Sequence, residues 1–241
     1  MSWRVKIIRK ISRIVDLATF YPKLKKYYKG YLSEGSPLVF DVGCNRGQSI
    51  DFFLSINKNI RIIAFEPNRK LYDALVKRYS ANQNIDIYNL GVSDKKGSLV
   101  FNENIFDETS TFETINSDSK YLQKKAKILG VSPDKVITKS YEVEVVDLNS
   151  FIKDKMIDEI AVVKIDVEGH EYSCLKGLFP DSSAAAKIGF LQLENHFDDM
   201  YDLHKGADDM QRLLSDAQFT LAFKVKNSLA DYEELIYRSE V

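Results

Sequence analysis

Short apolar segments that alternate with amphipathic segments constrain the fold of this chain most. The apolar segments are predicted strands of a buried sheet, because they lack the polar alternation of a half-exposed strand. We predict strands at 38–40, 61–65, 85–90, 160–165, 188–193, 219–225 and 235–237, and helices at 47–56, 69–80, 147–154, 169–177 and 205–216. This alternation predicts an α/β fold with a doubly wound, mostly parallel sheet of seven strands.

The same pattern divides the chain into parts. A length of 241 residues supports one large domain, which we place at 37–241. Residues 1–36 form a predicted helical extension. We interpret 103–135 as an insertion, either a cap-like segment over the active site or a surface loop. The sequence also predicts strands at 99–102 and 141–146, on either side of the insertion, and a helix at 119–129 within it.

The N-terminal extension is basic, although the whole chain carries a net charge of −1. Residues 1–30 hold nine lysines and arginines and one acid, Asp16, so this segment carries +8 and the remainder −9. Because the main body is acidic, we expect no nucleic-acid partner.

Residues 3–18 place their apolar side chains on one helical stripe. We expect Tyr21-Pro22 to end this helix and residues 23–32 to form a second one. The first helix either packs on the edge of the domain or lies on an anionic membrane surface, which the basic residues of 1–30 would contact.

The sequence predicts neither a membrane-spanning helix nor a signal peptide. No apolar run reaches the roughly 18 residues that span a bilayer, and Lys6, Arg9 and Lys10 interrupt any apolar signal region. The only two cysteines, Cys44 and Cys174, fit a reducing compartment. We therefore expect a cytoplasmic protein, peripheral to the inner face of the membrane if the basic extension binds lipid.

The segment after the first predicted strand, Asp41-Val-Gly-Cys-Asn-Arg-Gly47, is typical of a cofactor-binding loop. Gly43 and Gly47 allow a tight strand-to-helix turn and the close approach of a ligand to bare backbone. An acid at the strand end repels a pyrophosphate but accepts hydrogen bonds from an ammonium group. Asp41 therefore favours S-adenosylmethionine over a dinucleotide.

Two further segments fit an adenosine-bearing cofactor. Glu66 closes the second predicted strand, nineteen residues after Gly47, where a carboxylate can accept from both ribose hydroxyls. Asn89 and the backbone around Gly91 follow the third strand and are candidates for adenine contacts. Asn89 is equally compatible with a plain turn residue.

Five ionisable residues lie in Lys164-Ile-Asp-Val-Glu-Gly-His-Glu171, where a predicted strand runs into a helix. Ligands of open α/β folds bind at this edge of the sheet. Lys164 and Asp166 share one face, which predicts an internal ion pair, and Glu171 complements the helix dipole. Asp166 is predicted to orient the methionine part of the cofactor or an acceptor hydroxyl. His170, with an ordinary pKa of about 6.5, is the predicted general base.

A second polar group, Gln192-Leu-Glu-Asn-His196, ends the strand at 188–193. In the usual topology it emerges beside Asp166, so we expect Asp166, His170, Glu194 and His196 to converge. Glu194 is a further candidate catalytic residue. A divalent metal on these carboxylates stays open as an alternative, but no metal site is assigned because the spacing matches no metal motif.

Together these segments resemble the FkbM family of S-adenosylmethionine-dependent methyltransferases over about 37–195. The resemblance is carried by the loop at 41–47, Phe65-Glu-Pro67, Gly91-Val-Ser-Asp94, Asp147-Leu148 and, most specifically, the string at 164–171. It implies a class I, Rossmann-like sheet and O-methylation of a sugar, polyketide or other natural product. It also implies cofactor roles for Asp41, Gly43, Asn45, Gly47 and Glu66.

The expected reaction is an in-line displacement in which an acceptor oxygen attacks the sulfonium methyl group and S-adenosylhomocysteine leaves. Positioning supplies most of the acceleration, because the donor is already activated. The expected partner is a small-molecule or glycan acceptor. Two alternatives stay open: an oxidoreductase with a nucleotide cofactor, disfavoured by the missing Gly-x-Gly-x-x-Gly pattern, and a non-catalytic cofactor-binding module tethered by its basic arm.

Overall fold

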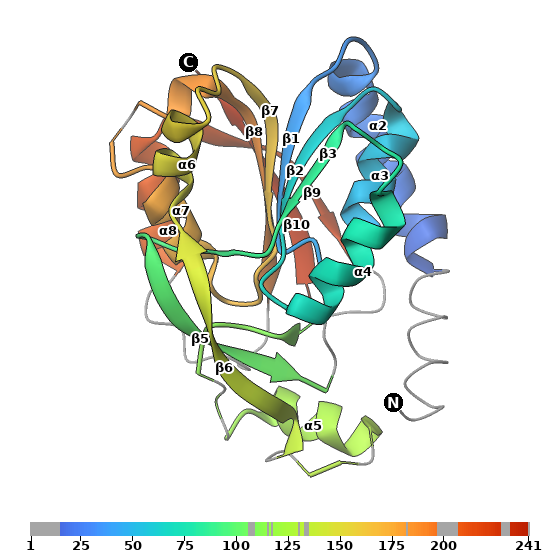
Figure 1. Cartoon of the computed structure of the whole chain (residues 1–241), viewed down its shortest axis with the longest axis vertical. Coiled ribbons are helices and arrows are strands. Elements are labelled where there is room, and N and C mark those ends of the chain that lie inside the picture. The colour runs from blue at the N-terminus through green and yellow to red at the C-terminus, as the bar shows by residue number, and fades with distance from the viewer. Residues whose placement is uncertain are drawn as a thin grey trace.

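The computed structural model describes residues 15–105, 109–114, 116, 118–129, 131–132, 135–181, 183–196, 207–227 and 232–240. Its centre is a seven-stranded sheet in the order β3-β2-β1-β7-β8-β10-β9 (Figure 1). The strands are β1 (Leu38–Val42), β2 (Arg61–Phe65), β3 (Ile85–Tyr88), β7 (Ile160–Ile165), β8 (Ile188–His196), β9 (Phe219–Lys226) and β10 (Tyr232–Ser239). The five strands β3, β2, β1, β7 and β8 pair in parallel, and β10 is antiparallel to its neighbours β8 and β9. The predicted mostly parallel sheet of seven strands is confirmed.

Strand β1 is an interior strand of the sheet, and all five of its residues are buried. It pairs with β2 on one side and with β7 on the other. The strand order therefore reverses direction at β1, and open α/β sheets bind their ligands at the carboxyl ends of the strands at such a point. Asp41 in β1, Glu66 after β2 and Asp166 after β7 all lie at this edge.

Helices cover both faces of the sheet (Figure 1). One face carries α2 (Tyr21–Leu32), α3 (Gln48–Ile56) and α4 (Arg69–Tyr79), and the other carries α6 (Leu148–Asp154), α7 (Glu171–Leu178) and α8 (Ala207–Asp216). Successive strand residues serve opposite faces, so Val39 joins one apolar core and Phe40 the other. Each fully buried large apolar side chain stabilises the fold by roughly 2 kcal/mol.

The N-terminal part of the described chain is continuously helical. A π-helical turn, η1 (Asp16–Phe20), leads directly into α2. The prediction that Tyr21-Pro22 ends one helix before another begins is therefore wrong. Pro22 lies in the first turn of α2, where its missing N–H is not needed, and the wider π turn precedes it. The predicted helix at 3–18 lies mostly outside the described residues.

Helix α2 packs on the sheet through Leu24, Tyr28 and Leu32, all of which are buried. These side chains belong to the same apolar core as Val39 and Ile50. Within the described ranges, no helix combines the length and apolar character needed to cross a membrane.

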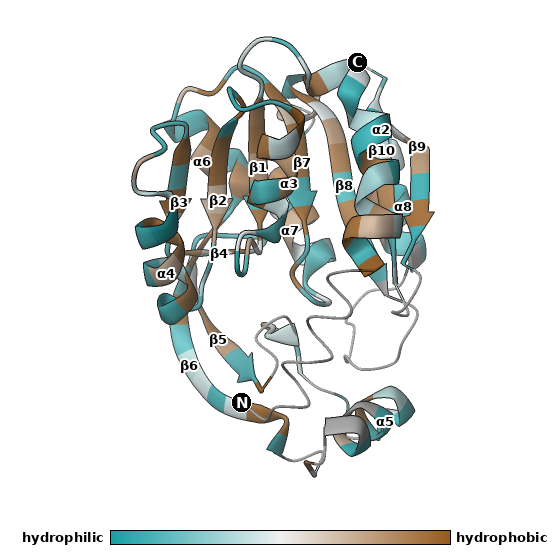
Figure 2. Ribbon diagram, turned by 90° about the vertical axis from the view of Figure 1, so that its right-hand side faces the viewer, coloured by the Kyte–Doolittle hydropathy of each residue, from teal (hydrophilic) through white to brown (hydrophobic). Residues whose placement is uncertain are grey.

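A smaller lobe extends beyond the carboxyl edge of the main sheet (Figures 1 and 2). In it, β4 (Gly91–Val92) and β5 (Gly97–Asn104) pair with β6 (Ile137–Val146), and α5 (Lys120–Leu129) lies at the far end. The prediction of a strand at 85–90 is too long, because β3 stops at Tyr88. Residues 91–92 belong to the three-stranded sheet of this lobe. Strand β6 begins earlier than predicted because its first residues pair with the end of β5.

Candidate functional site

The loop between β1 and α3 folds back over the end of β2. Gly43 (φ +82°), Asn45 (φ +47°) and Gly47 (φ +81°) all have left-handed backbone, which glycine and asparagine adopt most easily. The N–H groups of Gly43 and Cys44 donate to the carbonyl of Phe65 at 3.1 and 3.2 Å. The loop is therefore fixed to the strand that ends in Glu66.

The space beside both glycines is filled by the protein itself. A Cβ atom on Gly43 would lie 2.0 Å from the backbone oxygen of Asp166, and one on Gly47 would lie 2.5 Å from the hydroxyl of Tyr79. The close approach that these glycines allow is thus between segments of this chain. At Gly43 it brings the cofactor loop against the segment that leaves β7.

Asp41 presents a buried acceptor at the end of β1. Its side chain is fully buried, and Ser49 donates its hydroxyl to Oδ2. Among the described residues, Oδ1 has no hydrogen-bond partner. Burial raises the pKa of Asp41, against the opposing effects of Lys164 and Ser49. A buried acceptor without a donor is costly, so this atom fits a ligand that donates, such as the ammonium of a methionine moiety.

Glu66 is held by backbone amides on both sides. Its Oε2 accepts from the N–H of Asn45 at 2.8 Å and its Oε1 from the N–H of Asn68 at 2.8 Å. Asn68 in turn caps the N-terminus of α4 with its side chain. The carboxylate is therefore buried and oriented before any ligand binds. Since a carboxylate offers about four acceptor positions, two amide bonds leave capacity for vicinal hydroxyls.

The turn after β3 is built from Asn89 and Gly91. The amide of Asn89 donates to the carbonyls of Glu66 and Pro67 at 2.8 and 3.0 Å, which ties this turn to the one after β2. A Cβ atom on Gly91 would lie 2.4 Å from the ring of Phe112. Asn89 thus supports the wall beside the predicted ribose site, and its adenine contact stays a prediction.

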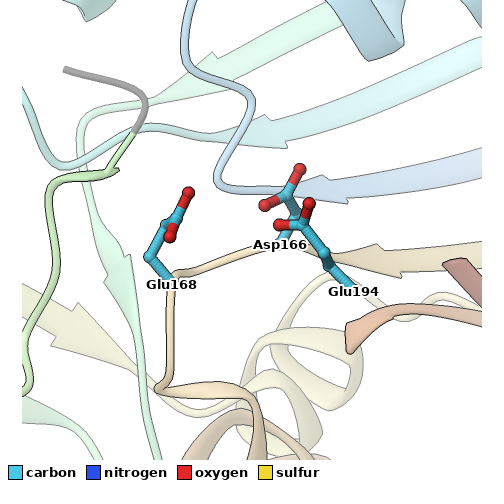
Figure 3. Close-up of side chains that lie close together, drawn as sticks. All are labelled: Asp166, Glu168 and Glu194. Carbon is cyan, nitrogen blue, oxygen red and sulfur yellow. The ribbon is translucent and has the colours of Figure 1, made fainter. Parts of the chain in front are cut away.

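Three carboxylates gather where β7 and β8 end (Figure 3). Asp166, Glu168 and Glu194 each place an oxygen within 4.8 Å of the others. Lys164 donates to Asp166 Oδ2 at 2.6 Å, which confirms the predicted ion pair. Burial lowers the pKa of Lys164, but the surrounding carboxylates, Asp166 first, outweigh it and raise the pKa above its ordinary value. These three acids are the described residues that a cation could use, and they are equally suited to hold hydroxyl groups.

His170 lies away from the three carboxylates. Only 6% of the residue is exposed, and both ring nitrogens are hydrogen-bonded: Nε2 to Ser93 Oγ at 2.9 Å and Nδ1 to Glu113 Oε1 at 2.6 Å. Phe112 packs against the imidazole ring, with centroids 5.2 Å apart. As a general base, His170 would have to exchange one of these partners for the acceptor.

The turn at 166–170 is fixed from two sides. Glu171 accepts from the N–H groups of Val167 and Gly169 at 3.1 and 3.0 Å, so it caps this turn as well as complementing the dipole of α7. Thr111 donates its hydroxyl to the carbonyl of Glu168 at 2.7 Å. Together with Glu113, Thr111 attaches the inserted segment to the edge of the main sheet.

The expected convergence of side chains is thus only partly seen. Asp166 and Glu194 come together, His170 points elsewhere, and the side chain of His196 lies outside the described residues. Glu168, Glu113 and Ser93 were not singled out from the sequence. Glu168 stands within the acidic string and had a local signal, but Glu113 is 57 residues from His170 in sequence and had none.

The strand order, the glycine loop after β1 and the acids at the ends of β1 and β2 define a class I methyltransferase fold. Residues 41–221 match the model of the methyltransferase FkbM domain. The chain therefore belongs to the FkbM family, and the protein is an S-adenosylmethionine-dependent methyltransferase. This assignment sets aside the oxidoreductase and the non-catalytic module that the sequence had left open.

Named relatives support the same class. The 2-O-methyltransferase NoeI of Sinorhizobium fredii is 19% identical over 199 residues, covering 81% of this chain and 78% of the relative. The hexuronic acid methyltransferase AglP of Haloferax volcanii is 25% identical over 203 residues, covering 83% and 70%. The magnesium protoporphyrin IX methyltransferase of Synechocystis, solved with bound S-adenosylmethionine, shares the fold with a TM-score of 0.50 at 16% identity, covering 98% of this chain and 83% of that one.

Proposed function

We propose that the protein transfers the methyl group of S-adenosylmethionine to a hydroxyl of a sugar or glycan. The observation that carries this proposal is the group of carboxylates, Asp166 and Glu194 with Glu168, beside the cofactor loop. Ionised carboxylates accept hydrogen bonds, so they can hold and orient the hydroxyl groups of a saccharide. Two relatives whose names specify a 2-O position and a hexuronic acid support the same acceptor class.

The two parts of the cofactor are assigned to the ends of two neighbouring strands, β1 and β2. Asp41 Oδ1 would accept from the ammonium of the methionine part, and Glu66 would accept from the ribose hydroxyls. When bound there, S-adenosylmethionine supplies an activated methyl group. The loop with Gly43, Asn45 and Gly47 holds these two acids at a fixed separation, because Asn45 donates its N–H directly to Glu66.

On the acceptor side, Asp166 and Glu194 orient the reacting hydroxyl and receive its proton. Lys164 donates to Asp166 Oδ2 at 2.6 Å and so fixes the orientation of this carboxylate. We assign proton acceptance to these carboxylates in preference to the predicted base His170, whose ring nitrogens are already bonded to Ser93 and Glu113. His170 then has a positioning role for the turn at 166–170.

Methyl transfer from radiolabelled S-adenosylmethionine to a panel of mono- and oligosaccharides tests the proposal. We expect Asp166→Asn and Glu194→Gln to lower kcat by about 10²-fold or more, with cofactor affinity kept. Glu66→Ala should instead weaken cofactor binding by about tenfold or more in calorimetry, through loss of charged hydrogen bonds. Glu159→Gln, an exposed acid at the opposite end of β7, is the matched control. No methylation of any saccharide in the panel, by enzyme that binds S-adenosylmethionine, would refute the proposed acceptor class.

Since His170 was the predicted base, His170→Ala separates the two assignments. If His170 is the base, the variant should lose kcat while the KM for the acceptor stays unchanged, because the lost bonds to Ser93 and Glu113 lower stability in either case. A positioning residue requires a fall in stability together with a rise in the KM for the acceptor.

A further inference from the structure

The cofactor loop is fixed at both of its ends to one neighbouring unit, which consists of β2 and the helix α4 that follows it. Near the start of the loop, two backbone N–H groups donate to the carbonyl of Phe65 at the end of β2. In the middle, the N–H of Asn45 donates to Glu66. At the end, Arg46 and Gly47 turn their carbonyl groups toward the last turn of α4. Five consecutive loop residues therefore bond to this one unit.

Two side chains in the last turn of α4 make the contacts at the end of the loop. The guanidinium of Arg78 donates to the carbonyl of Arg46 at 2.8 Å and to Asp51 Oδ2 at 2.5 Å. The hydroxyl of Tyr79 lies 2.8 Å from Asp51 Oδ1 and 3.1 Å from the carbonyl oxygen of Gly47, so its one proton is shared between two acceptors. The guanidinium also lies over the Tyr79 ring, 5.0 Å from its centroid. The two side chains thus bind the end of the loop and the first turn of α3 at the same time.

The end of the loop needs these contacts because its backbone is strained. Asn45 and Gly47 are both left-handed, and for a residue other than glycine this costs about 1 kcal/mol or more. Gly47 is also the N-cap of α3 and has no side chain with which to cap the helix. Such backbone persists only where its surroundings fix it. Arg78 and Tyr79 do so, although both lie outside the segments that carry the family resemblance.

The contacts from α4 act on both halves of the cofactor site. Asp41 lies in β1, and its Oδ2 accepts from Ser49 in the first turn of α3. Glu66 lies at the end of β2, directly before α4. Asp51 belongs to the same turn of α3 as Ser49, so the bond from Arg78 holds α3 against α4. The separation of the two acids, which the assigned cofactor spans, therefore depends on how firmly these two helices are joined.

We propose that Arg78 and Tyr79 are positioning residues for S-adenosylmethionine. They hold the end of the cofactor loop and the start of α3 against α4, and so keep Asp41 and Glu66 at the separation that the cofactor requires. The inference rests on the assignment of the cofactor to these two acids in the proposed function, and it does not depend on the identity of the acceptor. Because both side chains act through the loop, their loss weakens cofactor binding while the fold persists.

Calorimetry with S-adenosylmethionine and no acceptor tests the proposal. The test variant carries Arg78→Gln and Tyr79→Phe, and the matched control carries Arg238→Gln and Tyr31→Phe. In the control pair, too, the guanidinium lies over the tyrosine ring, at 5.8 Å. Arg238 pairs with Phe190 near the start of β8, at the opposite edge of the sheet from the loop. We expect the test variant to bind the cofactor about fivefold or more weakly, because part of the lost hydrogen-bond energy acts on the ligand, and the control to match the wild type.

Urea unfolding of the same proteins separates positioning from a purely structural role. A loss of global stability alone leaves the cofactor affinity unchanged, because a domain that is stable by about 5–15 kcal/mol stays almost fully folded. A test variant that loses stability but keeps its cofactor affinity would therefore overturn the proposal, and so would an equal loss of affinity in the control. Tyr79→Phe alone removes only a hydroxyl group and should weaken cofactor binding about twofold.

No saccharide takes part in these measurements, so they are independent of the proposed acceptor. If cofactor binding falls as expected but no sugar is methylated, the proposed function fails and the positioning role stands. If the wild type does not bind S-adenosylmethionine, the assignment of the cofactor to Asp41 and Glu66 fails, and the positioning role fails with it.

Discussion

Replacing Glu113 by alanine tests whether His170 fastens the inserted lobe to the methyltransferase domain. The carboxylate accepts from the ring of His170 at 2.6 Å, and both side chains are 8% exposed. Nothing else in the described structure bonds to that ring nitrogen, so the variant leaves a buried polar atom without a partner. We expect the free energy of unfolding to fall by about 3 kcal/mol, from the lost charged hydrogen bond and the unsatisfied nitrogen.

Glu113→Gln provides a graded comparison, because the amide oxygen can still accept from the imidazole. Only the contribution of the charge is then lost, and we expect a decrease of about 1 kcal/mol. Glu142→Ala, an exposed acid on β6 of the same lobe, is the control and should stay within about 0.5 kcal/mol of the wild type. Urea unfolding followed by tyrosine fluorescence measures all three differences.

Limited proteolysis shows whether the effect is local. If Glu113 fastens the lobe, Glu113→Ala should be cleaved between β5 and β6 faster than the wild type before global unfolding begins. A loss of stability in Glu113→Ala no larger than that of Glu142→Ala would refute the reasoning. An unchanged cleavage pattern in a destabilised variant would also refute it, since the pair would then stabilise the whole domain and have no specific effect on the lobe.

Three other substitutions give independent tests. Gly43→Ala should destabilise the fold by more than about 2 kcal/mol in thermal melts, because its Cβ would require a left-handed backbone and would clash with the backbone oxygen of Asp166. The control Gly97→Ala places its Cβ in open space and should be close to neutral. Asp41 has a pKa raised by burial, so its charged form costs stability as pH rises through that pKa. The stability of Asp41→Asn relative to the wild type, measured by urea titration, should therefore increase with pH, and a pH-independent difference would contradict this. The substitution should also lower the affinity for the cofactor. Tyr28→Phe should lose about 1 kcal/mol, because the buried hydroxyl donates to Gln192 at 2.9 Å; an unchanged urea midpoint would show that the bond contributes nothing.

Much of the fold follows from local patterns in the sequence. The predicted strands at 61–65 and 160–165 coincide with β2 and β7, because a short apolar run between polar turns has few alternatives to a buried strand. The errors arise where neighbours override the local pattern. Pro22 does not end the N-terminal helix, since a π turn accommodates it. The strand predicted at 85–90 stops at Tyr88, and residues 91–92, which follow it, pair with β6.

In the candidate site, too, some features follow from local sequence patterns and others only from long-range contacts. The positions of Asp41, Glu66 and Asp166 at one edge follow from strand order alone, since the carboxyl ends of parallel strands meet there. The Lys164–Asp166 ion pair follows from the two-residue period of a strand. The orientation of His170 does not, because its partners Ser93 and Glu113 lie 77 and 57 residues away in sequence.

The sequence by itself determined the class of fold, the cofactor loop and the acidic strand ends, because each depends on periodicity or on residues a few positions apart. Only the tertiary structure decided which side chains meet across the sheet edge. It brought Glu168 to Asp166 and Glu194 and bonded both nitrogens of His170. Contacts between distant segments depend on packing of the whole chain, and no local pattern encodes them.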